Sequence, residues 1–157
     1  MLFLKEIVFV RYQNTMEPQY KILIIDNNHD SLIYYQKYFK KQDFNVKIAR
    51  NALEGLEKFH EEKFQVTLIN INLPPLNAIE LIQMISDENI DTEIIIMSEK
   101  NEGNRDDAIA AINLGVKGWF EKSPLQLNHL LEKATNLAKS SGIDEIDCLL
   151  SSLPKQN

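Results

Sequence analysis

The sequence has few of the residues that cross-link or interrupt a chain: of 157 residues, one is cysteine, five are glycine and five are proline. The single Cys148 excludes an intramolecular disulfide and a cysteine-built zinc cluster, and it fits a reducing, cytoplasmic setting. The three histidines lack the spacing of a metal site. No apolar run reaches the ~18 residues that span a bilayer. The sequence therefore predicts a domain held together by its hydrophobic core.

Basic residues are also scarce relative to acidic ones. Lysine and arginine number 17 against 23 aspartates and glutamates, a formal net charge of -6. A protein that grips the phosphate backbone needs a basic surface, so we expect no nucleic-acid partner. The length fits one main domain, and a hydrophobic fraction of 44% is ordinary for a folded one.

From residue 20 onward, short apolar runs alternate with segments of helical spacing. The predicted strands are residues 22–25, 46–48, 64–69, 94–97 and 118–120. The predicted helices begin near Asp30 and Ser31, at Asn51, at Ile79, at Asp106 and at Pro124. Five strand–helix units in a row indicate a parallel sheet with helices on both faces. We predict an α/β, flavodoxin-like (βα)5 three-layer sandwich with a five-stranded parallel sheet.

The chain divides into three parts. Residues 1–19 form an N-terminal extension that is either an extra edge strand or a product of an upstream start, since Met16 opens a second plausible beginning. Residues 20–141 form the main domain. Gly142 is expected to stop the last helix, and residues 142–157 form a tail. The helical spacing of Ile143, Ile146 and Leu149 leaves two interpretations, a short amphipathic helix or a frayed terminus.

Polar side chains end four of the predicted strands. Asp26 and Asn27 follow the first, Asn70 the third, Ser98 the fourth and Lys122 the fifth. In an open parallel sheet, sites form at the carboxyl ends of the strands, close to where the strand order reverses. We therefore expect these residues on one rim. For each, an ordinary structural role remains the alternative.

The segments that carry these residues resemble a known family. Residues 22–27 (ILIIDN), 68–74 (LININLP), 95–98 (IIMS) and 114–122 (LGVKGWFEK) match, in order and spacing, the motifs of response regulator receiver domains in two-component phosphorelay signalling. The resemblance covers about residues 20 to 141. It implies a cytoplasmic signalling domain that binds a histidine kinase or an output protein.

The resemblance assigns the acidic pocket and shows two departures in it. Asn70 occupies the phosphoacceptor position, where the family has an aspartate that attacks a phosphoryl group. Asn27 replaces the second residue of the acidic pair, so only Asp26 remains anionic. A neutral amide is a poor nucleophile, and Mg²⁺ prefers carboxylates. We therefore expect no phosphorylation at Asn70, and no cofactor beyond weak Mg²⁺ binding through Asp26.

The resemblance also assigns three further positions. Ser98 and Trp119 are at the switch positions, and Lys122 is at the position that contacts the phosphoryl group. With Asn70 neutral, we expect Lys122 to pair with Asp26 and to hold the pocket in one fixed state.

The sequence thus predicts a pseudo-receiver without enzymatic activity, acting as a phosphorylation-independent protein–protein interaction module. Its surface would be the fourth helix, fifth strand and fifth helix, residues 106–113, 118–120 and 124–139, and its partner a histidine kinase, an output protein or a second copy. Two alternatives stay open. One is a working receiver modified at deamidated Asn70 or at another residue. The other is a flavodoxin-like small-ligand binder. Such a protein would need a glycine loop that holds phosphate, and this sequence has no glycine directly after the first strand.

Overall fold

The computed structural model describes the backbone of residues 20–154 and the side chains of residues 20–141, 153 and 154. A five-stranded parallel sheet in the order β2-β1-β3-β6-β7 forms its centre. The strands are β1 (Tyr20–Ile25), β2 (Phe44–Ala49), β3 (Val66–Asn70), β6 (Glu93–Ser98) and β7 (Gly118–Glu121). The predicted flavodoxin-like fold is confirmed. The N-terminal extension, residues 1–19, lies outside the described residues.

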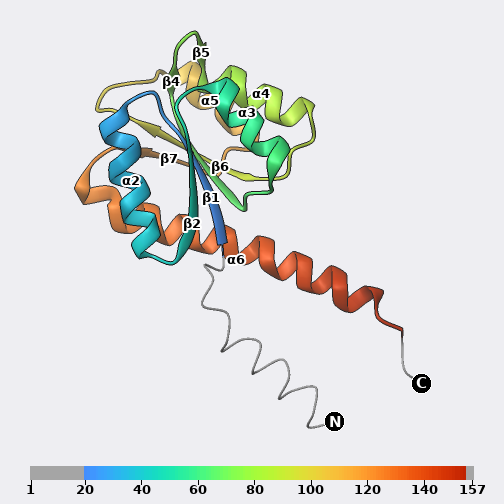
Figure 1. Cartoon of the computed structure of the whole chain (residues 1–157). Coiled ribbons are helices and arrows are strands. Elements are labelled where there is room, and N and C mark those ends of the chain that lie inside the picture. The colour runs from blue at the N-terminus through green and yellow to red at the C-terminus, as the bar shows by residue number, and fades with distance from the viewer. Residues whose placement is uncertain (1–19, 155–157) are drawn as a thin grey trace.

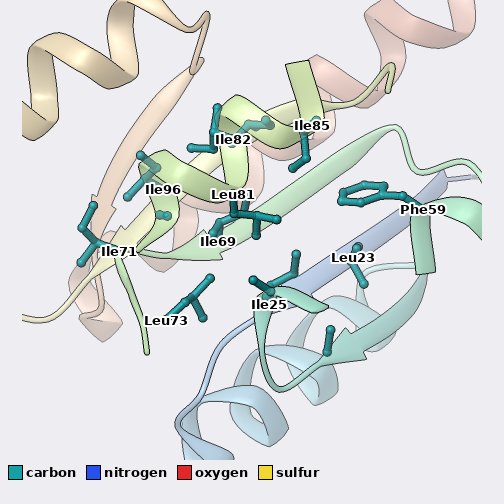
Figure 2. Close-up of a cluster of buried hydrophobic side chains, with 14 of the residues drawn as sticks. Leu23, Ile25, Phe59, Ile69, Ile71, Leu73, Leu81, Ile82, Ile85 and Ile96 are labelled. Carbon is teal, nitrogen blue, oxygen red and sulfur yellow. The ribbon is translucent and has the colours of Figure 1, made fainter. Parts of the chain in front are cut away.

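Helices cover both faces of this sheet (Figure 1). On one face lie α2 (His29–Lys41) and α6 (Leu127–Ser152), the latter preceded by a 3-10 turn, Pro124–Gln126. On the other lie α3 (Ala52–Glu61), α4 (Ala78–Asp87) and α5 (Arg105–Asn113). Successive strand residues point to opposite faces, so Ile22 and Ile24 pack toward α2 and α6, whereas Leu23 and Ile25 pack toward α3 and α4. Figure 2 shows this second cluster.

Asparagines begin four of the helices. The side chains of Asn28, Asn51, Asn77 and Asn104 each accept a hydrogen bond from a backbone N–H in the first turn. The predicted cap at Asn51 is confirmed. The prediction that α2 begins at Asp30 and Ser31 is wrong, because Asn28 accepts from the Ser31 N–H at 3.0 Å. This earlier start brings α2 closer to the end of β1.

Two leucines at or near the starts of helices are exposed, although apolar residues at helical spacing usually face the core. On α3 the buried residues include Ala52, Gly55 and Phe59, whereas Leu53 is 68% exposed. Gly55 faces Ile25 so closely that a Cβ atom would lie 2.6 Å from its Cδ1 atom, so the helix approaches β1 through a residue without a side chain. Leu125, expected in the core, is 87% exposed, because it lies in the 3-10 turn before α6.

Gly142 does not stop the last helix. The α6 backbone continues through it to Ser152 and runs past the end of the sheet (Figure 1). Glycine costs only about 1 kcal/mol in a helix interior, so the stop signal is too weak to act alone. Residues 72–77, between β3 and α4, form a small antiparallel pair, β4 (Asn72–Leu73) with β5 (Leu76–Asn77).

Within the part of the chain that the structure describes, no helix combines the length and the apolar character required to cross a membrane.

Candidate functional site

The chain order of the strands creates the site. β1 leads to β2 at one edge, and the chain then returns to β3 on the other side of β1, so the strand order reverses between β1 and β3. At the carboxyl ends of the strands lie Asp26, Asn70, Ser98 and Lys122, as predicted from their positions after the apolar runs. Asp26, Asn70 and Ser98 are 3%, 6% and 4% exposed. A polar group this buried needs partners, and these partners define the state of the pocket.

Asp26 and Lys122 form a buried ion pair. The Lys122 Nζ atom lies 2.6 Å from Asp26 Oδ2, and both side chains are less than one tenth exposed. The other oxygen, Oδ1, accepts the Asn28 N–H at 2.9 Å. The backbone N–H of Lys122 donates to the Ser98 carbonyl at 2.7 Å, which fixes the backbone position from which the lysine side chain extends. The expected pairing of Lys122 with Asp26 is therefore present.

Glu99 adds a second carboxylate to this pair. Its Oε1 atom lies 3.5 Å from Lys122 Nζ, and its side chain is about half exposed. Glu99 and Asp26 thus share one ammonium group. Removing Lys122 would leave Asp26 as a buried, unpaired charge, which typically costs about 3–5 kcal/mol.

Asn70 acts as a hydrogen-bond donor. Its Nδ2 atom donates to the Asn72 carbonyl at 2.8 Å and to Asn27 Oδ1 at 3.2 Å. Its Oδ1 atom is buried and has no partner among the described residues. A carboxylate cannot donate, so an aspartate here would place oxygen against two oxygens. The donor side of the amide is thus complementary to its surroundings.

The two switch positions contact each other. The Trp119 indole Nε1 donates to Ser98 Oγ at 2.9 Å, so the ring is turned toward the pocket and half-buried. Gly103 lies against the same ring. It has a φ of +82°, and a Cβ atom there would lie 2.5 Å from a ring carbon of Trp119. Any other residue at 103 would push the ring or the loop away.

Tyr35 lines the approach to Asp26 and Lys122 from α2. Burial raises the pKa of its hydroxyl above the usual range, and the nearby Tyr34, Glu99 and Asp26 raise it further.

Sequence reasoning did not include Tyr35, Glu99 or Gly103 in the site. No local signal in the sequence marks these three residues, because their neighbours come from distant segments. His29, the histidine nearest to Asp26 in the sequence, is exposed at the start of α2.

A family model for the response regulator receiver domain matches residues 22–135 of the chain. The chain belongs to this family. Curated relatives include the probable transcriptional regulator ycf29 of Pyropia yezoensis, 29% identical over 118 residues (75% of this chain, 53% of the relative). The chemotaxis protein CheY of Listeria monocytogenes is 28% identical over 120 residues (76% of this chain, 98% of the relative). This receiver domain is a module of two-component signalling.

Solved structures agree on the fold. A receiver domain from Clostridium thermocellum has a TM-score of 0.71 at 23% identity, covering 79% of this chain and 98% of that one. The Francisella response regulator 1452 receiver domain has a TM-score of 0.70 at 21% identity, covering 78% and 99%. The chain spans only part of the length of several curated relatives. It covers 53% of ycf29 of Pyropia yezoensis, 56% of the transcriptional regulatory protein YclJ of Bacillus subtilis and 63% of ycf29 of Porphyra purpurea.

The residues present do not fit the magnesium site that the family implies. Of the three positions that supply oxygen in the family, only Asp26 is anionic, and an ammonium group already contacts its Oδ2 atom. Asn27 Oδ1 accepts from Asn70, which itself turns its donor side toward the pocket. Among the described residues, no group of three or more His, Cys, Asp or Glu side chains is placed to hold a metal ion.

Proposed function

We propose that this receiver domain acts as a pseudo-receiver, a protein–protein interaction module whose pocket stays in one state without phosphorylation or Mg²⁺. The observation that carries the proposal is the donation of two hydrogen bonds by Asn70, with the buried Lys122–Asp26 pair beside it. The amide has no anionic oxygen to attack a phosphoryl group. The ammonium of Lys122 supplies, from within the chain, the positive charge that a metal would otherwise bring.

Conversion of Asn70 to aspartate by deamidation is also disfavoured. That reaction requires the backbone nitrogen of Ile71 to attack the Asn70 side chain. The Ile71 N–H donates to the Met97 carbonyl at 2.8 Å, and Ile71 is buried. These constraints argue against the alternative in which deamidated Asn70 is the phosphoacceptor.

The surface proposed for binding is the face formed by α5, β7 and α6. α5 buries only Ala111, while Ile109 and Ile112, which are three residues apart, are 47% and 72% exposed. Leu125, in the 3-10 turn that precedes α6, is 87% exposed. Exposed apolar residues on a short, lightly packed helix favour a protein partner, which would be a histidine kinase, an output protein or a second copy.

Intact-mass measurement after incubation with acetyl phosphate and Mg²⁺ tests the pocket. We expect no phosphoryl adduct on the native chain and an adduct on Asn70→Asp. An adduct on the native chain would refute the proposal, and mapping it would identify the acceptor.

The face is tested by measuring the molecular mass in solution at several concentrations for the native chain, Ile112→Ser and Leu53→Ser. The two substitutions remove similarly exposed apolar residues from different helices. Self-association that only Ile112→Ser weakens supports a homodimer through this face. A monomer at all concentrations rejects the homodimer and leaves a different protein as the partner. Weakening by Leu53→Ser alone would refute the choice of face.

A further inference from the structure

A groove opens beside Lys122, between the first turns of α2 and the segment that follows β7. Its volume is about 390 Å³, within the lower part of the range typical of small-ligand sites. Lys122 lines it, whereas Asp26, Asn70 and Trp119 do not. The residues relevant here are Asp30, Ser31, Tyr34, Tyr35, Glu99 and Lys122.

The charges around the groove favour a cation. Asp30 and Glu99 contribute two carboxylates to its lining, and the lining ammonium of Lys122 is balanced by Asp26 at 2.6 Å. The first turn of α2 adds a positive potential equivalent to roughly half a charge, which by itself would attract an anion. Three carboxylates, those of Asp26, Asp30 and Glu99, face the single ammonium of Lys122, and this excess of negative charge outweighs the helix terminus. The groove is therefore negative despite the lysine and the helix terminus in its wall.

Aromatic and hydroxyl groups complete the lining. Tyr34 is 46% exposed, and its ring is held edge-on against the buried Tyr35, with the ring centres 5.1 Å apart. The face of an anchored tyrosine ring attracts an organic cation. Ser31 also lines the groove, and its Oγ atom has no hydrogen-bond partner among the described residues. A hydrated metal ion would gain little from the ring, and among the described residues no group of three or more His, Cys, Asp or Glu side chains is placed to hold a metal ion, so the lining favours an organic cation.

We propose that this groove binds an alkylammonium or guanidinium group, with the Glu99 and Asp30 carboxylates as its ionic partners and the Tyr34 ring as its stacking surface. The site is independent of the proposed pseudo-receiver function, because it does not use Asn70 and does not depend on whether the chain is phosphorylated.

Calorimetric titration of the full chain tests this inference with agmatine, with an arginine peptide blocked at both ends, and with inorganic phosphate. We expect saturable binding of at least one guanidinium probe and none of phosphate. Glu99→Gln should weaken binding about threefold to fivefold, as for a partly exposed ion pair. Glu57→Gln, the same change at an exposed position on α3, should leave it unchanged. Tyr34→Ala should weaken binding, and Tyr34→Phe should retain it.

Saturable binding of either guanidinium probe supports the site. Tighter binding of agmatine indicates that the ligand is a free small molecule, and tighter binding of the arginine peptide indicates an arginine side chain of a protein. Binding of phosphate in place of both probes would overturn the assignment of charge. Equal loss in Glu99→Gln and Glu57→Gln would mean that net charge alone attracts the probe, which also refutes the site. Retention of full affinity by Tyr34→Ala would refute the stacking role. These outcomes are separate from those of the acetyl phosphate experiment.

Discussion

Replacing Asn70 with aspartate removes two partly buried hydrogen bonds. In the native chain, Nδ2 donates to the Asn72 carbonyl and to Asn27 Oδ1. The variant would place a carboxylate oxygen where the donor stands, 2.8 Å and 3.2 Å from those two oxygens. It would also put a second buried carboxylate on the rim that carries Asp26, whose Lys122 partner is already engaged.

The cost is worked from these contacts. Each lost hydrogen bond is worth about 1 kcal/mol net, and a buried group left unsatisfied adds about 1–3 kcal/mol. We therefore expect Asn70→Asp to lower the free energy of unfolding by about 3 kcal/mol, a large part of a typical total of about 5–15 kcal/mol. For a chain of this length, that corresponds to a fall in Tm of roughly 6–12 °C.

Urea denaturation at neutral pH, without divalent ions, measures the effect. Asn72→Asp is the matched control, because it makes the same amide-to-carboxylate change on an exposed side chain nearby, and it should stay within about 0.5 kcal/mol of the native chain. Added Mg²⁺ should stabilise Asn70→Asp and leave the native chain unchanged. If Asn70→Asp is as stable as the native chain without Mg²⁺, then Asn70 does not hold the pocket by donation.

Three further predictions concern other groups. Lys122→Met should lower the free energy of unfolding by about 3–5 kcal/mol, measured by urea denaturation, because it leaves Asp26 buried without its partner. Gly103→Ala should displace the ring of Trp119, the only tryptophan, and shift its fluorescence emission to longer wavelength. As the pH rises above about 10, the free energy of unfolding of Tyr35→Phe should fall less than that of the native chain. The raised pKa of Tyr35 keeps it neutral in the folded state, so its stabilising effect is complete below the unfolded-state pKa and falls as pH rises through the folded-state value.

Each of these has a matched control. Lys100→Met removes an exposed lysine and should be nearly neutral. Gly115→Ala carries the same backbone strain at a φ of +84° but has nothing within 4 Å of its Cβ position, so it should leave the tryptophan emission unchanged. Tyr34→Phe removes the neighbouring hydroxyl and should keep the native alkaline profile. A shift in emission with Gly115→Ala but not with Gly103→Ala would contradict the packing argument.

The sheet could be predicted because its strands are continuous apolar runs, each ended by a polar residue, and a parallel sheet places those ends on one rim. The Lys122–Asp26 pair was expected from the resemblance to receiver domains together with the neutral amide at position 70. Details that depend on a choice between similar neighbours could not be predicted. Asn28 and Asp30 are both good helix-capping residues, and the sequence does not distinguish them. In the structure Asn28 caps the helix, and its own N–H donates to Asp26 at the end of β1. Gly103 carries no signal in the sequence, because its importance comes from Trp119, sixteen positions away along the chain.

The two asparagines of the pocket have unequal roles. Asn27 receives a hydrogen bond through Oδ1, and an aspartate at 27 would accept that bond equally well. Asn70 gives two hydrogen bonds, and an aspartate at 70 could give neither. The amide at 70 therefore sets the polarity of the pocket, while the amide at 27 mainly keeps its charge low. With one carboxylate and one ammonium, the buried rim formed by Asp26 and Lys122 is close to neutral. A neutral rim requires no external ion to be stable, which supports the proposed fixed state of the pocket.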